Sequence, residues 1–195
     1  MALEHAIMVS LSERPGTGYE IGRQFERSIG YFWSATHQQI YRTLKKLHDD
    51  GLVSFESVAQ DGRPDKKVYT LSPTGYEMLA DWVNSPTPVS PLRSDLGVKL
   101  RAADLGDLPT VISELAEHRD EAAALLTVYR GFERDYYPDP QTLTGRRLHQ
   151  YLVLRGGVRM SESTVQWCDE VLAGLRRELA ASASHPQTTS SAPTP

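Results

Sequence analysis

The stretch FWSATHQQIYRTLKKLHDDGLV, residues 32–53, decides how the first half of this chain folds. Within it Ile40, Leu44 and Leu47 recur at steps of four and three, which is the spacing of one buried face of an α-helix. Every other position on that helix is polar, small or aromatic with a polar tip. The sequence therefore predicts an amphipathic helix over residues 34–50.

The period changes after this helix. Gly51 is a stop signal, because glycine readily takes the left-handed conformation that ends many helices. Four apolar residues then alternate with polar neighbours, as on half-buried strands: Val53, Phe55, Tyr69 and Leu71. Asp61-Gly62 lies between the two pairs and is typical of a turn. The pattern predicts a two-stranded antiparallel hairpin.

Further helices flank these elements. One stripe near the N-terminus ends before Pro15-Gly16 and consists of Leu3, Ile7 and Leu11. A short helix fits residues 17–28, with Ile21 and Phe25 as its buried pair, and Ser72-Pro73 is typical of a helix start after the hairpin. Three helices, a two-stranded wing and a further helix predict a mainly α protein. Its first half is expected to be a winged helix-turn-helix.

The outward face of the third helix follows from its buried face. At about 100° per residue, the side chains that point away from the core are those of Gln38, Arg42, Lys45 and Lys46, with Gln39 and Tyr41 on the two flanks. The segment from residue 27 to residue 48 contains no acidic residue. In a helix-turn-helix the recognition helix lies in the DNA major groove. We therefore interpret this face as a candidate DNA-binding surface.

Different side chains suit different parts of DNA. Arginine pairs with guanine and glutamine with adenine, so Gln38, Gln39 and Arg42 are candidate base readers. Lys45 and Lys46 are candidate phosphate contacts.

The predicted wing extends this cationic set. It carries three basic residues, Arg63, Lys66 and Lys67, which suit phosphates or an adjacent minor groove. The alternative interpretation is that all these charges form ordinary solvated faces. Their concentration on one helix and one wing favours DNA.

Composition excludes several classes of protein. The chain has 195 residues with 21 Lys and Arg against 25 Asp and Glu, a net charge of −4, so it is no histone-like polycation. It has one cysteine and therefore no intramolecular disulfide, and it has no apolar run long enough for a membrane span. Its N-terminus lacks the basic start of a signal peptide. We expect a cytoplasmic protein.

Proline and polar residues divide the chain. Three prolines fall within NSPTPVSP, and the end of the chain is rich in Ser, Thr, Ala and Pro. The predicted organisation is a winged-helix domain at 1–85, a linker at 86–91, a helical dimerisation domain at 92–182 and a disordered tail at 183–195.

Two apolar seams occupy the second half. One consists of Val111, Leu115, His118, Ala122, Leu125, Tyr129 and Phe132. The other consists of Val165, Cys168, Leu172, Leu175 and Leu179. Steps of three and four are typical of coiled coils and helical bundles. We expect the second seam, with Cys168 as a packed residue, to form a homodimer interface, and we expect His118 to be a packed residue of the first seam. The alternative is that both seams pack within one chain.

These segments resemble a known family. Residues 32–53, followed by GRPDKKVYTLSPTG at 62–75, resemble the winged-helix core of PadR-like transcriptional regulators. The opening LEHAIMVSL and GTGYEI resemble the first two helices of the same pattern. PLRSDLGVKL at 91–100 and RRLHQYLVLRGGVRMSESTVQWCDEVL at 146–172 resemble the larger helical C-terminal domain of one PadR subgroup.

The resemblance implies further site residues. It makes Tyr41 a contact to the DNA backbone and places Ser34, Thr36 and His37 at or near the start of the recognition helix, where helix N-termini favour anions. It also implies a homodimer on a palindromic operator. Many members have proline after the tyrosine, whereas this chain has Arg42, an additional cation at the groove.

No motif indicates catalysis. The chain lacks G-x-S-x-G, G-x-x-x-x-G-K-[ST] and strand-linked G-x-G-x-x-G, and its histidines show no paired metal spacing. We expect no enzyme, cofactor or metal. The leading hypothesis is a repressor relieved by a small-molecule effector, and the alternative is a winged-helix scaffold for another protein. Five aromatic residues are either pocket lining for a planar effector or core: Trp33, Trp82, Tyr136, Tyr137 and Trp167.

Overall fold

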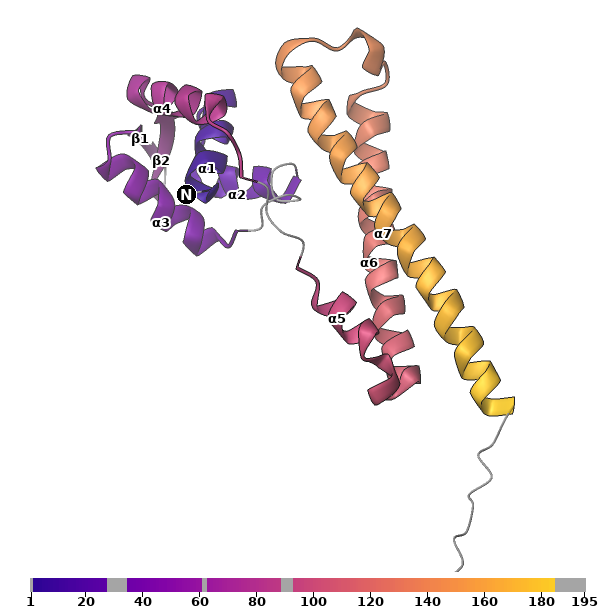
Figure 1. Ribbon diagram of the computed structural model, residues 1–195. Helices are drawn as coiled ribbons and strands as arrows, with labels where there is room; N and C mark the ends of the chain where they lie inside the picture. The colour runs from indigo at the N-terminus through magenta and orange to yellow at the C-terminus, as the bar shows by residue number, and fades with distance from the viewer. Residues whose placement is uncertain (1, 28–34, 61–62, 89–92, 185–195) are drawn as a thin grey trace, which may run out of the picture. The chain divides into compact units, whose positions relative to one another are not determined.

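The computed structural model describes residues 2–27, 35–60, 63–88 and 93–184. The chain forms two compact units, residues 1–90 and residues 91–195 (Figure 1). Each unit has its own elements and its own core, and the two are described separately below. Among the described helices, none is long and apolar enough to cross a membrane.

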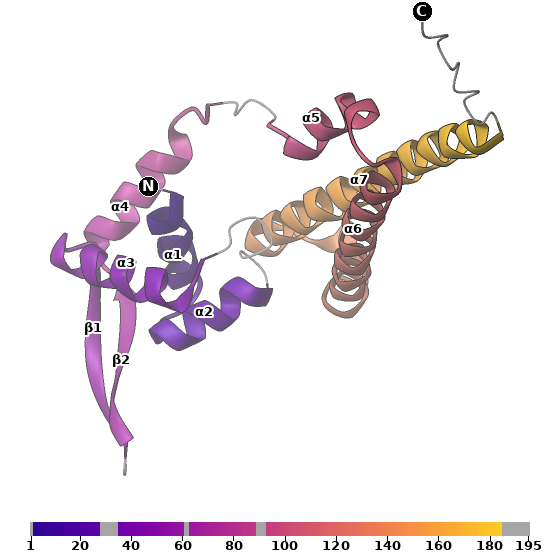
Figure 2. The same cartoon turned by 90° about the horizontal axis from the view of Figure 1, so that it is seen from below.

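The first unit is a winged helix, as the sequence predicts. Its elements are α1 (Ala2–Glu13), α2 (Gly18–Arg27), α3 (His37–Asp49), β1 (Val53–Gln60), β2 (Arg63–Leu71) and α4 (Pro73–Asn84). Figure 2 shows the two strands side by side, extending away from the helices as a wing. The predicted turn at Asp61-Gly62 lies outside the described residues.

The strands are antiparallel. Val53 pairs with Leu71 and Phe55 with Tyr69. Gly16, between α1 and α2, adds a bridge at the base of the wing: its N–H donates to the Tyr69 carbonyl oxygen at 3.0 Å, and the Tyr69 N–H donates to the Gly16 carbonyl oxygen at 2.9 Å. The wing is therefore joined to the helices by backbone hydrogen bonds as well as by its core side chains.

One apolar core holds this unit together. Ile40, Leu44 and Leu47 of α3 are at most 1% exposed, which confirms the predicted buried face. The remaining buried core residues come from the other five elements and from Leu52: Ile7, Met8, Leu11, Ile21, Phe25, Leu52, Val53, Tyr69, Leu71 and Leu79. Because α3 is buried along a single stripe, its opposite face is free for other contacts.

The start of α3 differs from the prediction. The helix begins at His37 rather than at residue 34, because Thr36 caps it: the Thr36 hydroxyl accepts from the Gln39 N–H at 3.2 Å, and the Thr36 N–H donates to the Gln39 side-chain oxygen at 2.8 Å. This reciprocal pair is a capping box. At the other end Gly51 has a φ of 73°, the left-handed conformation expected of it. Ser34 lies outside the described residues.

The second unit is helical. It contains α5 (Asp95–Arg101), the short 3-10 helix η2 (Ala103–Leu105), α6 (Leu108–Tyr136), the short 3-10 helix η3 (Pro140–Thr142) and α7 (Gly145–Ser184). The two long helices pack against each other, and Figure 1 shows them alongside one another. The predicted tail falls mostly on residues 185–195, which lie outside the described part of the chain.

The apolar seams of this unit meet within one chain. Leu115 of α6 packs with Cys168 and Leu172 of α7, and partly buried residues of α5, α6 and α7 surround them. Cys168 is 0% and Leu172 is 4% exposed in the single chain. These two residues therefore have no surface left for a partner, which corrects the prediction that they lie in the dimer interface. His118 is exposed rather than packed.

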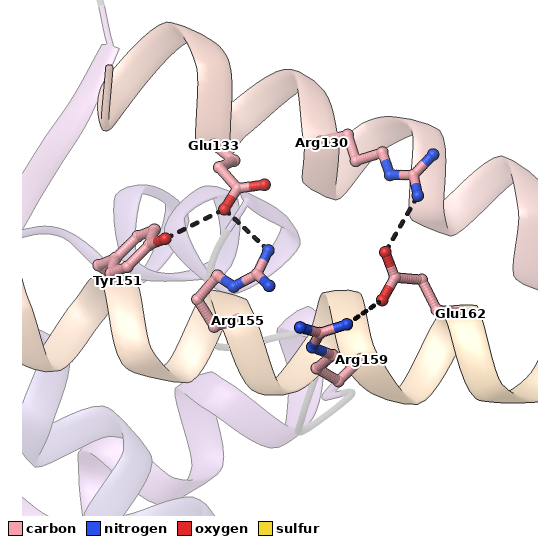
Figure 3. A network of polar contacts seen from close by, with 6 residues as sticks. All are labelled: Arg130, Glu133, Tyr151, Arg155, Arg159 and Glu162. Atoms are coloured by element: carbon pink, nitrogen blue, oxygen red, sulfur yellow. Dashed lines mark hydrogen bonds and ion pairs between the residues drawn. The ribbon is translucent and has the colours of Figure 1, made fainter. Parts of the chain in front are cut away.

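Polar contacts set the register of α6 against α7. Figure 3 shows two carboxylates of this kind, each accepting from two side chains. Glu133 accepts from the Tyr151 hydroxyl at 3.2 Å and from the Arg155 guanidinium at 2.9 Å. Glu162 accepts from Arg130 at 3.0 Å and from Arg159 at 3.1 Å. Sliding one helix by a turn would break both groups, so they select a single alignment of the pair.

Candidate nucleic-acid interface

The predicted DNA-binding side chains of α3 all reach the surface. The exposed set, with the capping residue, is Thr36, His37, Gln38, Gln39, Tyr41, Arg42, Lys45 and Lys46. Their outward direction confirms the face deduced from the periodicity. Their contacts within the protein, however, divide them into three kinds.

Gln38 and Arg42 are the side chains of this face without a polar contact to another described residue. They lie four positions apart, so they are neighbours on the helix surface. Neither forms a hydrogen bond or an ion pair with any residue that the structure describes. An exposed amide next to an exposed guanidinium matches the donor and acceptor pattern of base edges in a major groove.

Gln39 is committed to the capping box. Its side-chain oxygen accepts from both the N–H and the hydroxyl of Thr36, at 2.8 and 3.2 Å. A bidentate contact to adenine needs that oxygen as an acceptor, so base reading would open the cap. The structure gives Gln39 a role in starting the helix, and the predicted role in reading bases would compete with it.

The two lysines of α3 have acidic partners. Lys45 lies 3.2 Å from Asp49 one turn along the helix, and both side chains are mostly exposed. Lys46 contacts Glu4 of α1, an ion pair between two helices. The hydrogen bond from Lys46 lowers the pKa of Glu4, and the same bond raises the pKa of Lys46. Each lysine of α3 is therefore paired with a carboxylate.

The wing lysines differ from each other. The Lys67 ammonium lies 4.1 Å from the centroid of the Phe55 ring, a cation–π contact that holds it against the strand pair. Lys66 is exposed, and no described residue forms a hydrogen bond or an ion pair with it. For Arg63 the structure describes the backbone at the start of β2.

A hollow of about 700 Å³ lies between α2, α3 and strand β2 of the wing. Its lining residues are Thr17, Gly18, Tyr19, Glu20, Tyr41, Asp65, Lys66, Lys67 and Tyr69. Burial raises the pKa of Tyr69, whereas hydrogen bonds from Thr17 lower the pKa of Glu20. Sequence reasoning identified Tyr41 and the two lysines but missed Tyr19 and Tyr69, which the fold brings to the same hollow.

The five candidate aromatic residues do not share one environment. Trp82 stacks on His5 in the first unit, with ring centroids 4.3 Å apart. In the second unit Tyr137 packs against Tyr151 at 5.4 Å, while Tyr136 and Trp167 are exposed. Trp33 lies outside the described residues. Across the described residues no cluster of His, Cys, Asp and Glu is arranged to hold a metal ion.

Two family models match the chain, one on each unit. Residues 7–81 match the transcriptional regulator PadR-like family, and residues 92–176 match the family described as virulence activator alpha C-term. The first match spans the winged helix, and the second spans α5, α6 and most of α7.

Relatives extend over almost the full length. A protein of Mycobacterium tuberculosis named Probable transcriptional regulator Rv1176c is 47% identical, covering 91% of this chain and all of that protein. The virulence activator AphA of Vibrio cholerae has a similar structure, with a TM-score of 0.75 and 35% identity over 90% of this chain and 99% of that one.

A third relative has been solved with ligands. The negative transcriptional regulator PadR of Bacillus subtilis is 28% identical over 90% of this chain and 98% of that protein. Its complex with operator DNA has a TM-score of 0.78 over 90% of this chain and 99% of that one, and its complex with p-coumaric acid has a TM-score of 0.72 over the same shares. With these matches and the winged helix, the chain belongs to the PadR-like family of transcriptional regulators and is a regulator rather than an enzyme.

Proposed function

We propose that this protein is a sequence-specific DNA-binding repressor that acts as a homodimer on a palindromic operator and is released by a small-molecule effector. The observation that carries the proposal is the uncommitted pair Gln38 and Arg42 on the outward face of α3. The recognition helix of a helix-turn-helix lies in the major groove. In that position Arg42 suits guanine and Gln38 suits adenine.

The surroundings of this pair suit the DNA backbone. Lys45, Lys46 and Lys66 supply positive charge near it, and Tyr41 of α3 lines the hollow beside the wing. Phosphate contacts of this kind position a protein on DNA without reading sequence. The Bacillus subtilis relative, solved with operator DNA, supports the same arrangement here.

The homodimer is assigned to the face of α7 that α6 does not cover. Val153, Met160 and Trp167 follow one another at seven-residue steps on this helix and are 54%, 67% and 40% exposed. A seven-residue apolar repeat is typical of a helix that packs against another helix. On the same helix, Val165, Leu175 and Leu179 of the predicted interface also keep part of their surface. A second copy would bury this stripe.

Gel shifts with fragments of the protein's own promoter region test DNA recognition. We expect retarded bands that survive an excess of unrelated DNA. A scaffold that has lost operator recognition would show weak binding that salt abolishes and no preference among fragments. That result would favour the alternative, a winged-helix module for binding another protein.

The effector and the direction of control need separate measurements. Adding p-coumaric acid to the complex, with a phenol lacking the carboxylate as control, tests whether this chain shares the ligand class of the Bacillus subtilis relative. A reporter gene behind the bound promoter tests repression. Increased expression in the presence of the protein would instead make it an activator, as AphA is named.

A further inference from the structure

Two glycines of α2 lie directly against two rings of α3. A Cβ added at Gly18 would fall within 3.0 Å of three ring atoms of Tyr41. A Cβ added at Gly22 would lie 2.5 and 2.7 Å from Cε1 and Nδ1 of His37. Real Cβ atoms are not found this close to other heavy atoms, so at both places the absence of a side chain provides the space that the ring occupies.

The spacing of the four residues makes this a matched fit. Gly18 and Gly22 are four positions apart on α2, and His37 and Tyr41 are four positions apart on α3. Residues at this spacing share one face of a helix. Each ring therefore has its own glycine. Tyr19 adds a second contact, because its ring stacks nearly parallel to that of His37 with centroids 5.9 Å apart.

Backbone conformation does not explain why position 22 is a glycine. The glycines with a positive φ in the described chain are Gly51 and Gly145, and Gly22 lies inside a regular helix. Glycine is less favourable than alanine at an interior helical position. The space taken by the His37 ring is the feature of the structure that favours glycine here.

We propose that Gly18 and Gly22 are positioning residues that aim the rings of Tyr41 and His37 at the DNA backbone. The proposal rests on the proposed function. Both rings lie at the start of α3, on the exposed surface that faces DNA when this helix enters the major groove. Tyr41 also lines the hollow that contains Lys66. The orientation of the Tyr41 ring therefore determines whether its hydroxyl and the Lys66 ammonium can contact the same stretch of DNA backbone.

A methyl group at Gly18 is expected to move the ring rather than unfold the protein. The Tyr41 side chain is 50% exposed, so its ring can swing toward solvent. Tyr41 is on a flank of α3, and the core residues Ile40, Leu44 and Leu47 lie on a different face and need not move. The predicted consequence is a folded protein with a misdirected tyrosine.

The experiment compares single variants of the full chain. Gly18→Ala and Gly22→Ala should each remain folded, with a cooperative melting transition, and lose about tenfold in operator affinity, the size of one hydrogen bond to a charged group. Gly16→Ala is the matched control, because a Cβ there would meet its nearest neighbours at an ordinary 3.8 Å. It should bind the operator like the wild type.

Double variants show whether each glycine acts through its ring. In a Tyr41→Ala background Gly18→Ala should cost no further affinity, whereas in a His37→Ala background it should cost its full amount. Gly22→Ala should show the reverse pattern. Equal, additive losses in both backgrounds would overturn the proposal, as would wild-type affinity of the two single glycine variants.

Folding and function are separated by two further outcomes. If Gly18→Ala unfolds and Tyr41→Ala restores its folding, the glycine serves stability and the positioning role is wrong. If the wild type itself shows no operator preference, the proposed function fails first, and the positioning role fails with it. In the second case the aromatic NMR signals of Tyr41 in folded Gly18→Ala still report whether the added methyl group displaces its ring.

Discussion

Lys46 of α3 is paired with Glu4 of α1, across 42 positions of sequence. The Glu4 side chain is 23% exposed and that of Lys46 is 60% exposed, so the pair joins two helices at the edge of the core. A cation on the recognition helix is thus partly neutralised by a carboxylate from the first helix.

Removing this carboxylate should strengthen DNA binding. Glu4→Gln leaves Lys46 without an ionic partner, and a released lysine can neutralise one more phosphate. We expect tighter binding to all DNA sequences and a steeper salt dependence, by about one unit in the slope of log affinity against log salt concentration. Filter binding over a range of salt measures this slope. Glu77→Gln on α4 removes one negative charge away from Lys46 and is the control. If Glu77→Gln strengthens DNA binding as much as Glu4→Gln does, the increase comes from the change in net charge and not from the release of Lys46.

The same pair should contribute to stability in a defined pH range. The hydrogen bond from Lys46 holds the pKa of Glu4 below its ordinary 4.5. A carboxylate with a lowered folded pKa stabilises the protein above its unfolded pKa, and this contribution is lost as the pH falls through the folded value. Melting temperatures should therefore fall less steeply between about pH 5 and pH 3 in Glu4→Gln than in the wild type. Parallel curves would show that the pair adds no stability.

Arg42 and Lys45 should separate specificity from affinity. Arg42 has no described partner, whereas Lys45 is an exposed lysine paired with Asp49. Arg42→Ala should cost about 1–3 kcal/mol on the operator and less on unrelated DNA. Lys45→Ala should weaken binding to both by the same factor and reduce the salt slope. Competition gel shifts with operator and scrambled DNA measure the difference. If Arg42→Ala lowers the affinity for operator and scrambled DNA equally, Arg42 contacts phosphates and does not read bases.

The two faces of α7 should respond differently to mutation. Leu172 is buried against α6, so Leu172→Ala should lower the free energy of unfolding by about 2–5 kcal/mol through a cavity in the single chain. Met160 is exposed on the proposed dimer face, so Met160→Glu should dissociate the dimer and leave the chain folded. Chemical denaturation and light scattering distinguish the two effects. A fully dimeric Met160→Glu would place the interface elsewhere.

Periodicity in the sequence was enough to predict the winged helix. The apolar spacing of α3 determines which side is buried, and therefore which side chains point outward. The start of α3 was also readable, since Thr36 and Gln39 have the spacing of a capping box. Apolar periodicity alone does not fix the first residue of a helix, and the side chain of Gln39 is held by Thr36 three residues away.

Contacts between distant residues were decided by the tertiary structure. Nothing in the sequence around Lys46 indicates Glu4, and nothing around Tyr41 indicates Gly18, because each partner lies on another helix. The seam from Val165 to Leu179 shows the same limit. Apolar residues at steps of three and four positions indicate that one face of a helix is buried. They do not indicate whether the helix that covers this face belongs to the same chain or to a partner. Here α6 covers Cys168 and Leu172, because one chain folded into a hairpin brings that surface to them without a second copy.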